Sequence, residues 1–185
     1  MQNSASTMIA LFTAAVLLFI IPLVTLADRK DNVTQENVKL IVEKFVTEVT
    51  STGKLTRNQY QNFQNELATT GDTTFEIDLT IQHLDENPGK KTAQANYTKI
   101  GENVYYSEYT SQILKQIGIR VDEESVNEKD DTILLKEGDL VYVDVKNENS
   151  TTAQTLKSSF LGFSNAGEYV ISANSSGMVT VNGAE

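Results

Sequence analysis

The feature that most constrains this chain is an uncharged apolar stretch near its N-terminus. Residues 8–27 read MIALFTAAVLLFIIPLVTLA, with two threonines as the only polar side chains. Twenty helical residues span about 30 Å, which is the hydrocarbon thickness of a bilayer. Pro22 removes one backbone hydrogen bond, a defect that membrane helices tolerate, and it predicts a kink. The stretch therefore predicts a transmembrane helix over residues 8–27, with the water boundary at Asp28.

Two other interpretations of this stretch stay open. A cleaved signal peptide has a basic n-region and a shorter apolar core. Residues 1–7 (MQNSAST) contain no Lys or Arg, and Thr25-Leu26-Ala27 matches a small-residue cleavage site poorly. A buried core helix is more often about 10–14 residues long. The residues favour a retained anchor, with a polar N-terminus at 1–7, the span at 8–27, a stalk helix at 28–54 and a folded domain at 55–185.

The charge of the chain lies entirely outside this span. The formal net charge is −10, and every charged side chain lies at or after Asp28. Such a surface repels phosphate backbones, so we expect no nucleic-acid partner. Cysteine is absent, which excludes disulfides, zinc–thiolate sites and thiol nucleophiles.

Helical periodicity dominates the residues that follow the span. From Val33 to Thr50, apolar residues recur in steps of three and four, and Gly53 is a plausible stop. Thr56 followed by Gln59 predicts a capping box at the start of a second helix, which Gly71 ends. The apolar positions expected in the core are Val38, Ile41, Val42, Phe45, Val46, Val49, Tyr60, Phe63 and Leu67.

The remaining elements mix strands with short helices. The stretch from Thr74 to Leu84 alternates, with Phe75, Ile77, Leu79 and Ile81 on one face, as in a strand with one buried face. The other expected elements are a helix at Tyr105–Ile117, a hairpin of Ile133–Leu135 with Leu140–Val145 around Lys136–Asp139, a capped helix carrying Ala153, Leu156, Phe160 and Leu161, and final strands Tyr169–Ala173 and Met178–Val181 joined by a turn at Asn174–Gly177. In the hairpin, Val141, Val143 and Val145 are expected to face inward. This order predicts an α+β fold, in which the transmembrane and stalk helix and the short helices pack against an antiparallel sheet.

No catalytic, cofactor-binding or metal site is predicted, and we expect no enzyme activity. His83 is the only histidine, and at the end of a strand beside a charged turn it is expected to face solvent. One histidine without cysteine gives little basis for a metal site or a nucleophilic triad. Gly89-Lys90-Lys91 lacks the upstream glycine of a phosphate-binding loop.

Acidic and aromatic clusters are the other candidate binding sites in the sequence. Asp122-Glu123-Glu124 and Asp130-Asp131 are interpreted as a solvated loop, with a loose calcium site as the alternative, because the spacing of an EF-hand loop is missing. Half-buried packing is the favoured interpretation of the tyrosines, and a ligand-facing cluster is the alternative; these are Tyr97, Tyr105, Tyr106 and Tyr109. Glycosylation sequons begin at Asn32, Asn96, Asn149 and Asn174.

Several segments together resemble a known group of proteins. They are FVTEVTSTGKLTRNQYQNFQNELATTG (Phe45–Gly71), DENPGKKTAQAN (Asp85–Asn96), KIGENVYYSEYTSQIL (Lys99–Leu114), LLKEGDLVYVDVKNENSTTAQTLK (Leu134–Lys157) and SSGMVTVNG (Ser175–Gly183). With the apolar span, they are similar to small membrane-anchored, pilin-like proteins of Gram-positive bacteria, found with tight-adherence (type IV-like) pilus machinery. Type IV pilins carry a basic leader and a Glu near the start of the mature helix, and residues 1–27 contain neither.

The resemblance implies a minor pilin or pseudopilin-like component of a bacterial surface pilus. Its partners would be the lipid bilayer, through residues 8–27, and other pilus proteins. It implies an extracytoplasmic domain on a single-pass anchor, whereas Arg29, Lys30 and Lys39 would by the positive-inside rule hold the domain in the cytoplasm. The alternative function is a membrane-tethered module that binds or senses a ligand without catalysis.

Overall fold

The computed structural model describes residues 2–71, 73–85, 104–119, 132–162 and 171–183. The described elements form an α+β fold with an antiparallel sheet, as the sequence predicts. In chain order they are α1 (Gln2–Thr52), β1 (Lys54–Thr56), α2 (Arg57–Thr70), β2 (Phe75–Asp85), β3 (Val104–Tyr109), α3 (Thr110–Gln116), β4 (Thr132–Leu134), β5 (Leu140–Asn147), α4 (Thr152–Leu161) and β6 (Ser172–Met178).

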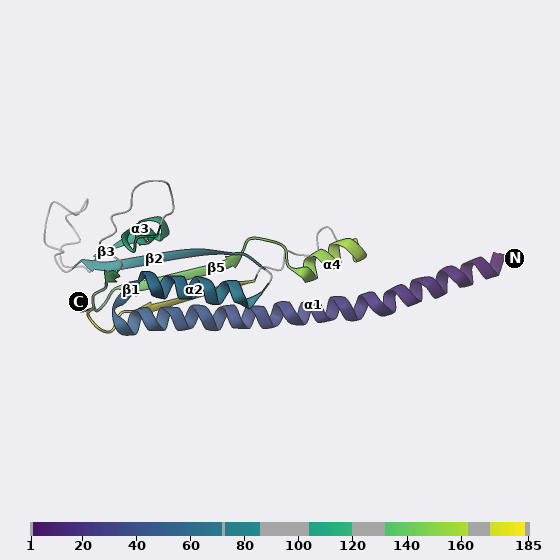
Figure 1. Ribbon diagram of the computed structural model, residues 1–185, viewed down its shortest axis with the longest axis horizontal. Helices are drawn as coiled ribbons and strands as arrows, with labels where there is room; N and C mark the ends of the chain where they lie inside the picture. The colour runs from purple at the N-terminus through teal and green to yellow at the C-terminus, as the bar shows by residue number, and fades with distance from the viewer. Residues whose placement is uncertain (1, 72, 86–103, 120–131, 163–170, 184–185) are drawn as a thin grey trace.

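The first helix, α1, runs almost the whole length of the molecule. The sheet, α2 and α3 gather around its C-terminal half, while its N-terminal half extends beyond them (Figure 1). The helix continues through Pro22 and curves gradually in its N-terminal part. It ends at Gly53, whose positive φ of 64° suits glycine, and whose N–H donates to the Val49 carbonyl. An added Cβ at Gly53 would lie 2.3 Å from the Val181 carbonyl oxygen.

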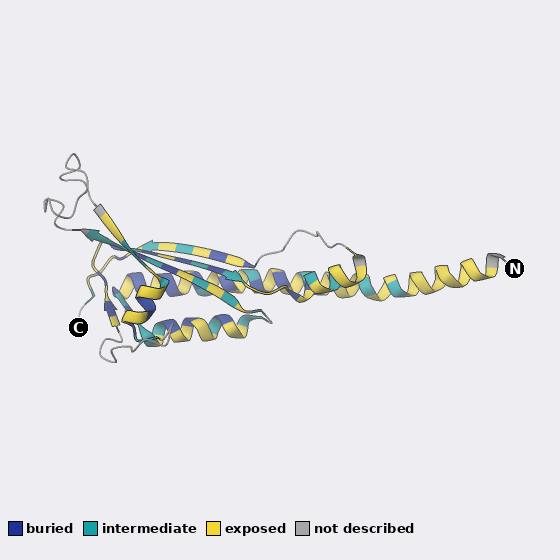
Figure 2. Cartoon of the chain, turned by 90° about the horizontal axis from the view of Figure 1, so that it is seen from above, coloured by how far each residue is buried: buried dark blue, intermediate teal, exposed yellow. Residues whose placement is uncertain are grey.

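The C-terminal half of α1 forms the core with α2. The stripe predicted from its periodicity is buried at Val38, Val42, Phe45, Val46 and Val49, and Ile41 is partly buried. The α2 capping box is confirmed, because Thr56 Oγ1 accepts from the Gln59 N–H while the Gln59 side chain accepts from the Thr56 N–H. Tyr60, Phe63 and Leu67 are buried against the stripe, and the Phe45 and Phe63 rings stack at 4.3 Å. Figure 2 shows this burial confined to one half of α1.

The main sheet has four antiparallel strands in the order β3-β2-β5-β6. The alternation predicted for β2 is confirmed: Leu79 and Ile81 are buried, and they pair with the inward-facing Val143 and Val141 of β5. The helix α1 packs against β5 and β6, while α3 packs against β2 and β3. The inner face of the sheet is therefore covered by two different helices.

The predicted turn at Asn174–Gly177 is wrong. These residues are the middle of β6, a single strand that pairs with β5 from Leu140↔Met178 to Lys146↔Ser172. Their small side chains allow α1 to lie close: a Cβ at Gly177 would lie 3.1 Å from both Val46 Cγ1 and Thr50 Cγ2. Close packing under the helix overrides the turn propensity of the sequence. Residues 169 and 170 of the predicted strand lie outside the described part of the chain.

The predicted hairpin of residues 133–135 with 140–145 is also wrong. The strand β4 pairs instead with β1, with Leu55 opposite Ile133, and β5 pairs with β2 and β6. The turn at Lys136–Asp139 therefore connects two separate sheets. It is fixed by an exchange of backbone hydrogen bonds with Val179: Gly138 N–H donates to the Val179 carbonyl, and Val179 N–H donates to the Asp139 carbonyl.

The predicted helix at Tyr105–Ile117 is right only in its second half. Residues 104–109 are the edge strand β3, and α3 begins at Thr110. The Thr110 hydroxyl takes the place of the next strand residue, accepting from the Leu79 N–H and donating to the Leu79 carbonyl. Ile113, Leu114 and Ile117 are buried, as the helical spacing indicates. The predicted fourth helix is confirmed as α4, with a capping box between Thr151 and Gln154.

Candidate functional site

The N-terminal half of α1 is a long apolar surface. The helix is long and apolar enough to cross a membrane, and none of its most apolar window is buried in the described structure. Its large side chains stand out into the surroundings, and those of Met8, Phe12, Leu18 and Phe19 are all more than two-thirds exposed. Exposed apolar patches of this extent mark a surface that contacts lipid or another protein. The first buried residue of α1 is Ala27, the last residue of the uncharged stretch.

A second candidate site is a polar cavity at the opposite end of the molecule. It has a volume of about 790 Å³ and lies between α3, β4 and the ends of β2 and β3. The lining mixes charged, amide and apolar side chains: His83, Leu84, Tyr106, Glu108, Gln112, Lys115, Gln116, Thr132, Ile133, Leu134, Lys136 and Asp139. The sequence did not predict this cavity.

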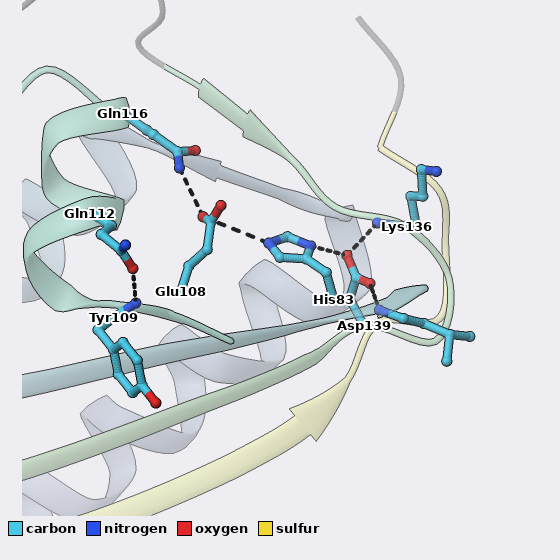
Figure 3. Close-up of polar contacts among 8 residues, drawn as sticks. His83, Glu108, Tyr109, Gln112, Gln116, Lys136 and Asp139 are labelled. Carbon is cyan, nitrogen blue, oxygen red and sulfur yellow. Dashed lines mark hydrogen bonds and ion pairs between the residues drawn. The ribbon is translucent and has the colours of Figure 1, made fainter. Parts of the chain in front are cut away.

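His83 does not face solvent, contrary to the prediction. Its side chain is 13% exposed, and its Nδ1 lies 2.9 Å from Asp139 Oδ2. Its Nε2 lies 3.7 Å from Glu108 Oε2 (Figure 3). The Tyr106 ring stacks on the imidazole, with 5.0 Å between the ring centroids. The reason is positional: His83 follows Ile81 by two residues on β2, so it lies on the same inward face. The alternation of the strand carried this signal in the sequence.

Asp139 organises the polar end of the sheet. The side chain is only 1% exposed, and both carboxylate oxygens accept hydrogen bonds. Oδ1 accepts from the Leu84 N–H at 3.0 Å, and Oδ2 accepts from the Lys136 N–H at 3.0 Å as well as contacting His83. A buried carboxylate needs such partners because desolvation penalises its charged form. Asp139 thus ties the turn after β4 to the end of β2.

Glu108 completes the row of polar groups. Its Oε2 accepts a hydrogen bond of 2.8 Å from the Gln116 side chain on α3. The imidazole therefore lies between two carboxylates, one buried and one at the cavity wall (Figure 3). Such an arrangement can orient a histidine, and its groups can donate hydrogen bonds to a small polar ligand or accept them from it. Among the described residues, no group of three or more His, Cys, Asp or Glu side chains is arranged to hold a metal ion.

The tyrosines do not form the half-buried cluster that the sequence suggests. Tyr106 lines the cavity, whereas Tyr105 and Tyr109 do not, and all three are exposed. Because β3 is a strand, neighbouring tyrosines point to opposite faces of the sheet. A ligand pocket walled by all of them is therefore absent from the described part of the chain.

Other candidates from the sequence lie elsewhere. Of the four sequon asparagines, Asn32, Asn149 and Asn174 lie at exposed positions, and Asn149 Oδ1 accepts from the Thr74 N–H. The remaining candidates lie outside the described residues: Gly89-Lys90-Lys91, Asn96, Tyr97, Asp122-Glu123-Glu124 and Asp130-Asp131. The calcium interpretation of the acidic loop therefore stays a prediction.

Comparisons of this chain with protein-family models, with curated proteins and with solved structures found no match.

Proposed function

We propose that this chain is a membrane-anchored structural or assembly component of a bacterial pilus-like surface apparatus, of the minor pilin or pseudopilin-like kind. Its activity is protein–protein contact rather than catalysis. The anchor is α1 over residues 8–27, and the domain formed by the rest of the described chain lies outside the cytoplasm. Pilin-like proteins set one long N-terminal helix against an antiparallel sheet, which is the arrangement of α1 and the β3-β2-β5-β6 sheet.

One observation carries the proposal: a single helix is apolar and unburied over its N-terminal half and packed into the domain over its C-terminal half. A core helix would be covered along its length, and this one is not. A retained anchor and a cleaved signal differ in mass. The intact mass of the protein from native membranes therefore distinguishes them, and loss of about the first 27 residues would remove the anchor from the proposal.

The test of the function is capture of partners in the native membrane. A photo-crosslinking amino acid replaces Phe19, on the unburied half of α1, or Leu40, an exposed residue on the domain half. After irradiation in cells and purification in detergent, we expect the Phe19 variant to recover other pilus proteins more strongly than the Leu40 variant. If neither position captures a pilus component, the assembly function is wrong.

The placement of the domain is tested separately. Cysteine is absent from the chain, so single-cysteine variants carry one unambiguous label. We expect Ser51→Cys, exposed at the C-terminal end of α1, to react with a membrane-impermeant maleimide in intact cells, and Ser4→Cys to react only after lysis. The reverse pattern would place the domain in the cytoplasm, as Arg29, Lys30 and Lys39 suggest by the positive-inside rule.

The polar cavity favours a second candidate, a membrane-tethered module that binds a small polar ligand. His83 is the only histidine, so its imidazole nitrogen signals in NMR are unambiguous. A ligand in the cavity should shift them, and Glu108→Gln, which removes the charge facing Nε2, should weaken that binding. The matched control is Glu43→Gln, at an exposed position of α1. Candidate ligands extracted from the native cells that leave the His83 signals unmoved would argue against this function.

A further inference from the structure

A groove runs along the junction between the apolar half of α1 and the folded domain. It has a volume of about 740 Å³ and lies between α1, α4 and the end of α2. Its walls are mainly apolar, with two cationic residues among them: Leu23, Leu26, Ala27, Arg29, Lys30, Val33, Thr34, Thr70, Thr152 and Leu156. Leu23 and Leu26 also belong to the uncharged stretch, so the groove is continuous with the surface proposed to contact lipid.

The helix α4 is tied to α1 beside this groove. The Thr151 hydroxyl, at the N-cap of α4, donates to the buried Asp31 carboxylate, and Lys157 Nζ lies 2.6 Å from Asp28 Oδ1. Ala153 is buried at the contact. Figure 1 shows α4 beyond the end of the sheet, with its N-terminal end beside α1 and its C-terminal end farther along the molecule toward the N-terminus of α1.

Near its C-terminal end, α4 carries an apolar side chain that the described residues leave about half exposed. Phe160 is 55% exposed, and Lys157 is the only charged residue of the helix. A helix with one apolar and one polar face can lie at the boundary between headgroups and acyl chains, about 5–10 Å deep, with its apolar side chains toward the acyl chains. The position of α4 alongside the end of the span places Phe160 at this boundary if residues 8–27 cross the membrane.

The charges at the junction fit an anionic headgroup. Asp28 is paired with Lys157, and the Asp31 carboxylate accepts a hydrogen bond from the Thr151 hydroxyl. Arg29 and Lys30 are exposed and line the groove where the apolar stretch ends. Cations at this depth attract anionic lipids with about 1 kcal/mol each, or about a fivefold preference.

We propose that α4 lies in the membrane interface and that the groove between α1 and α4 holds an acyl chain of an anionic phospholipid, whose headgroup contacts Arg29 and Lys30. This inference rests on the proposed anchor, because it needs residues 8–27 to be in the bilayer. The bound lipid and α4 together fix how the domain sits on the membrane.

The test uses single-tryptophan variants of the full chain, which has no tryptophan of its own. The variants are Phe19→Trp in the apolar stretch, Phe160→Trp on α4 and Tyr142→Trp on β5 in the sheet. Each is reconstituted in nanodiscs whose phospholipids are brominated at positions spread from the headgroup end of the acyl chain to its tail. We expect bromine to quench most of the fluorescence of Phe19→Trp and Phe160→Trp, and to leave Tyr142→Trp unchanged.

The outcomes separate the two proposals. Quenching at residue 19 without quenching at residue 160 overturns the inference and leaves the anchor intact. Absence of quenching at residue 19 overturns the anchor itself.

Headgroup selectivity is tested with the same Phe160→Trp protein. Brominated phosphatidylglycerol at low mole fraction should quench severalfold more than brominated phosphatidylcholine at the same fraction. The double change Arg29→Gln and Lys30→Gln should abolish this difference. The control is Lys39→Gln with Lys54→Gln, which removes the same charge from the domain side and should preserve the preference. Equal quenching by both lipids in the Phe160→Trp protein that keeps Arg29 and Lys30 would overturn the assignment of an anionic lipid.

Discussion

The two halves of α1 are both helical and both carry apolar residues, but they differ in how these residues are arranged. In the C-terminal half the apolar residues form one stripe, which the sheet and α2 cover completely at Val38, Val42 and Val49. In the N-terminal half they surround the helix, and no described element covers them. A stripe fits a helix on the surface of a domain, whereas an apolar girdle fits one immersed in an apolar medium. The two halves of this helix are therefore suited to different surroundings.

Because of this difference, burial of apolar side chains contributes to a different process in each half. Burying a Val, Leu, Ile or Phe side chain contributes about 1.5–3 kcal/mol. In the C-terminal half this contribution belongs to folding of the domain. In the N-terminal half the proposed bilayer supplies it, so changes there should alter membrane insertion and leave the unfolding free energy of the domain unchanged.

The largest expected effect is a charge in the covered half. Val42 is fully buried, and Val42→Asp places an unpaired carboxylate in the core. We expect a loss of several kcal/mol in the free energy of unfolding, enough to unfold a domain of ordinary stability. Urea unfolding in detergent micelles, followed by circular dichroism, measures it. Leu40→Asp, at an exposed position two residues earlier on another face of the helix, should change stability by no more than about 0.5 kcal/mol; equal effects would show that the stripe is not the core.

The matching change in the uncovered half is Leu18→Asp. Leu18 is 71% exposed in the middle of the apolar stretch. A carboxylate at the centre of a membrane helix costs about 2.5–3.5 kcal/mol on insertion scales. We expect the variant to insert less well in a microsomal insertion assay, while the urea midpoint of the domain in micelles stays that of the parent. A shifted midpoint would mean that this half contributes to the fold.

The sequence predicted single elements of the fold better than it predicted how distant segments pair. Several signals within one element were confirmed, including the α1 stripe, the Thr56–Gln59 capping box and the alternation of β2. Pairing between distant segments was not. Nothing local indicates that Leu55 lies opposite Ile133, because that register depends on the whole chain.

The candidate sites show the same limit. His83, Glu108 and Asp139 come from three separate segments, and only the fold brings them together. The inward orientation of His83 could have been predicted from the sequence, because His83 follows the buried Ile81 by two residues along β2. The turn composition of Asn174–Gly177 misled the prediction, because the small residues that favour a turn here make room for α1.

That close approach gives a smaller prediction about the covered half. Gly177→Val places a branched side chain where a Cβ already lies 3.1 Å from Val46 and Thr50. Valine favours strands, but overpacking costs about 1–3 kcal/mol, so we expect a net loss of stability in urea unfolding. Ser176→Val, at an exposed position of the same strand, provides the matched control and should be neutral or slightly stabilising. A stable Gly177→Val variant would mean that α1 can move away from β6.

The smallest expected effect is a loss of domain stability at alkaline pH, which should leave the attachment of α1 to the membrane unchanged. Burial raises the pKa of Tyr60, and a hydrogen bond from Lys44 to Glu66 raises the pKa of Lys44. Both shifts favour the protonated forms in the folded state, so their stabilisation is complete below about pH 10 and is lost as the pH rises further.

The stretch 8–27 has no ionisable side chain. In an alkaline carbonate wash we expect the protein to stay in the membrane pellet while the domain becomes sensitive to protease. Tyr60→Phe should reduce that sensitivity, because phenylalanine has no proton to lose. Release of the intact chain into the supernatant would show instead that the domain, and not α1, holds the protein to the membrane.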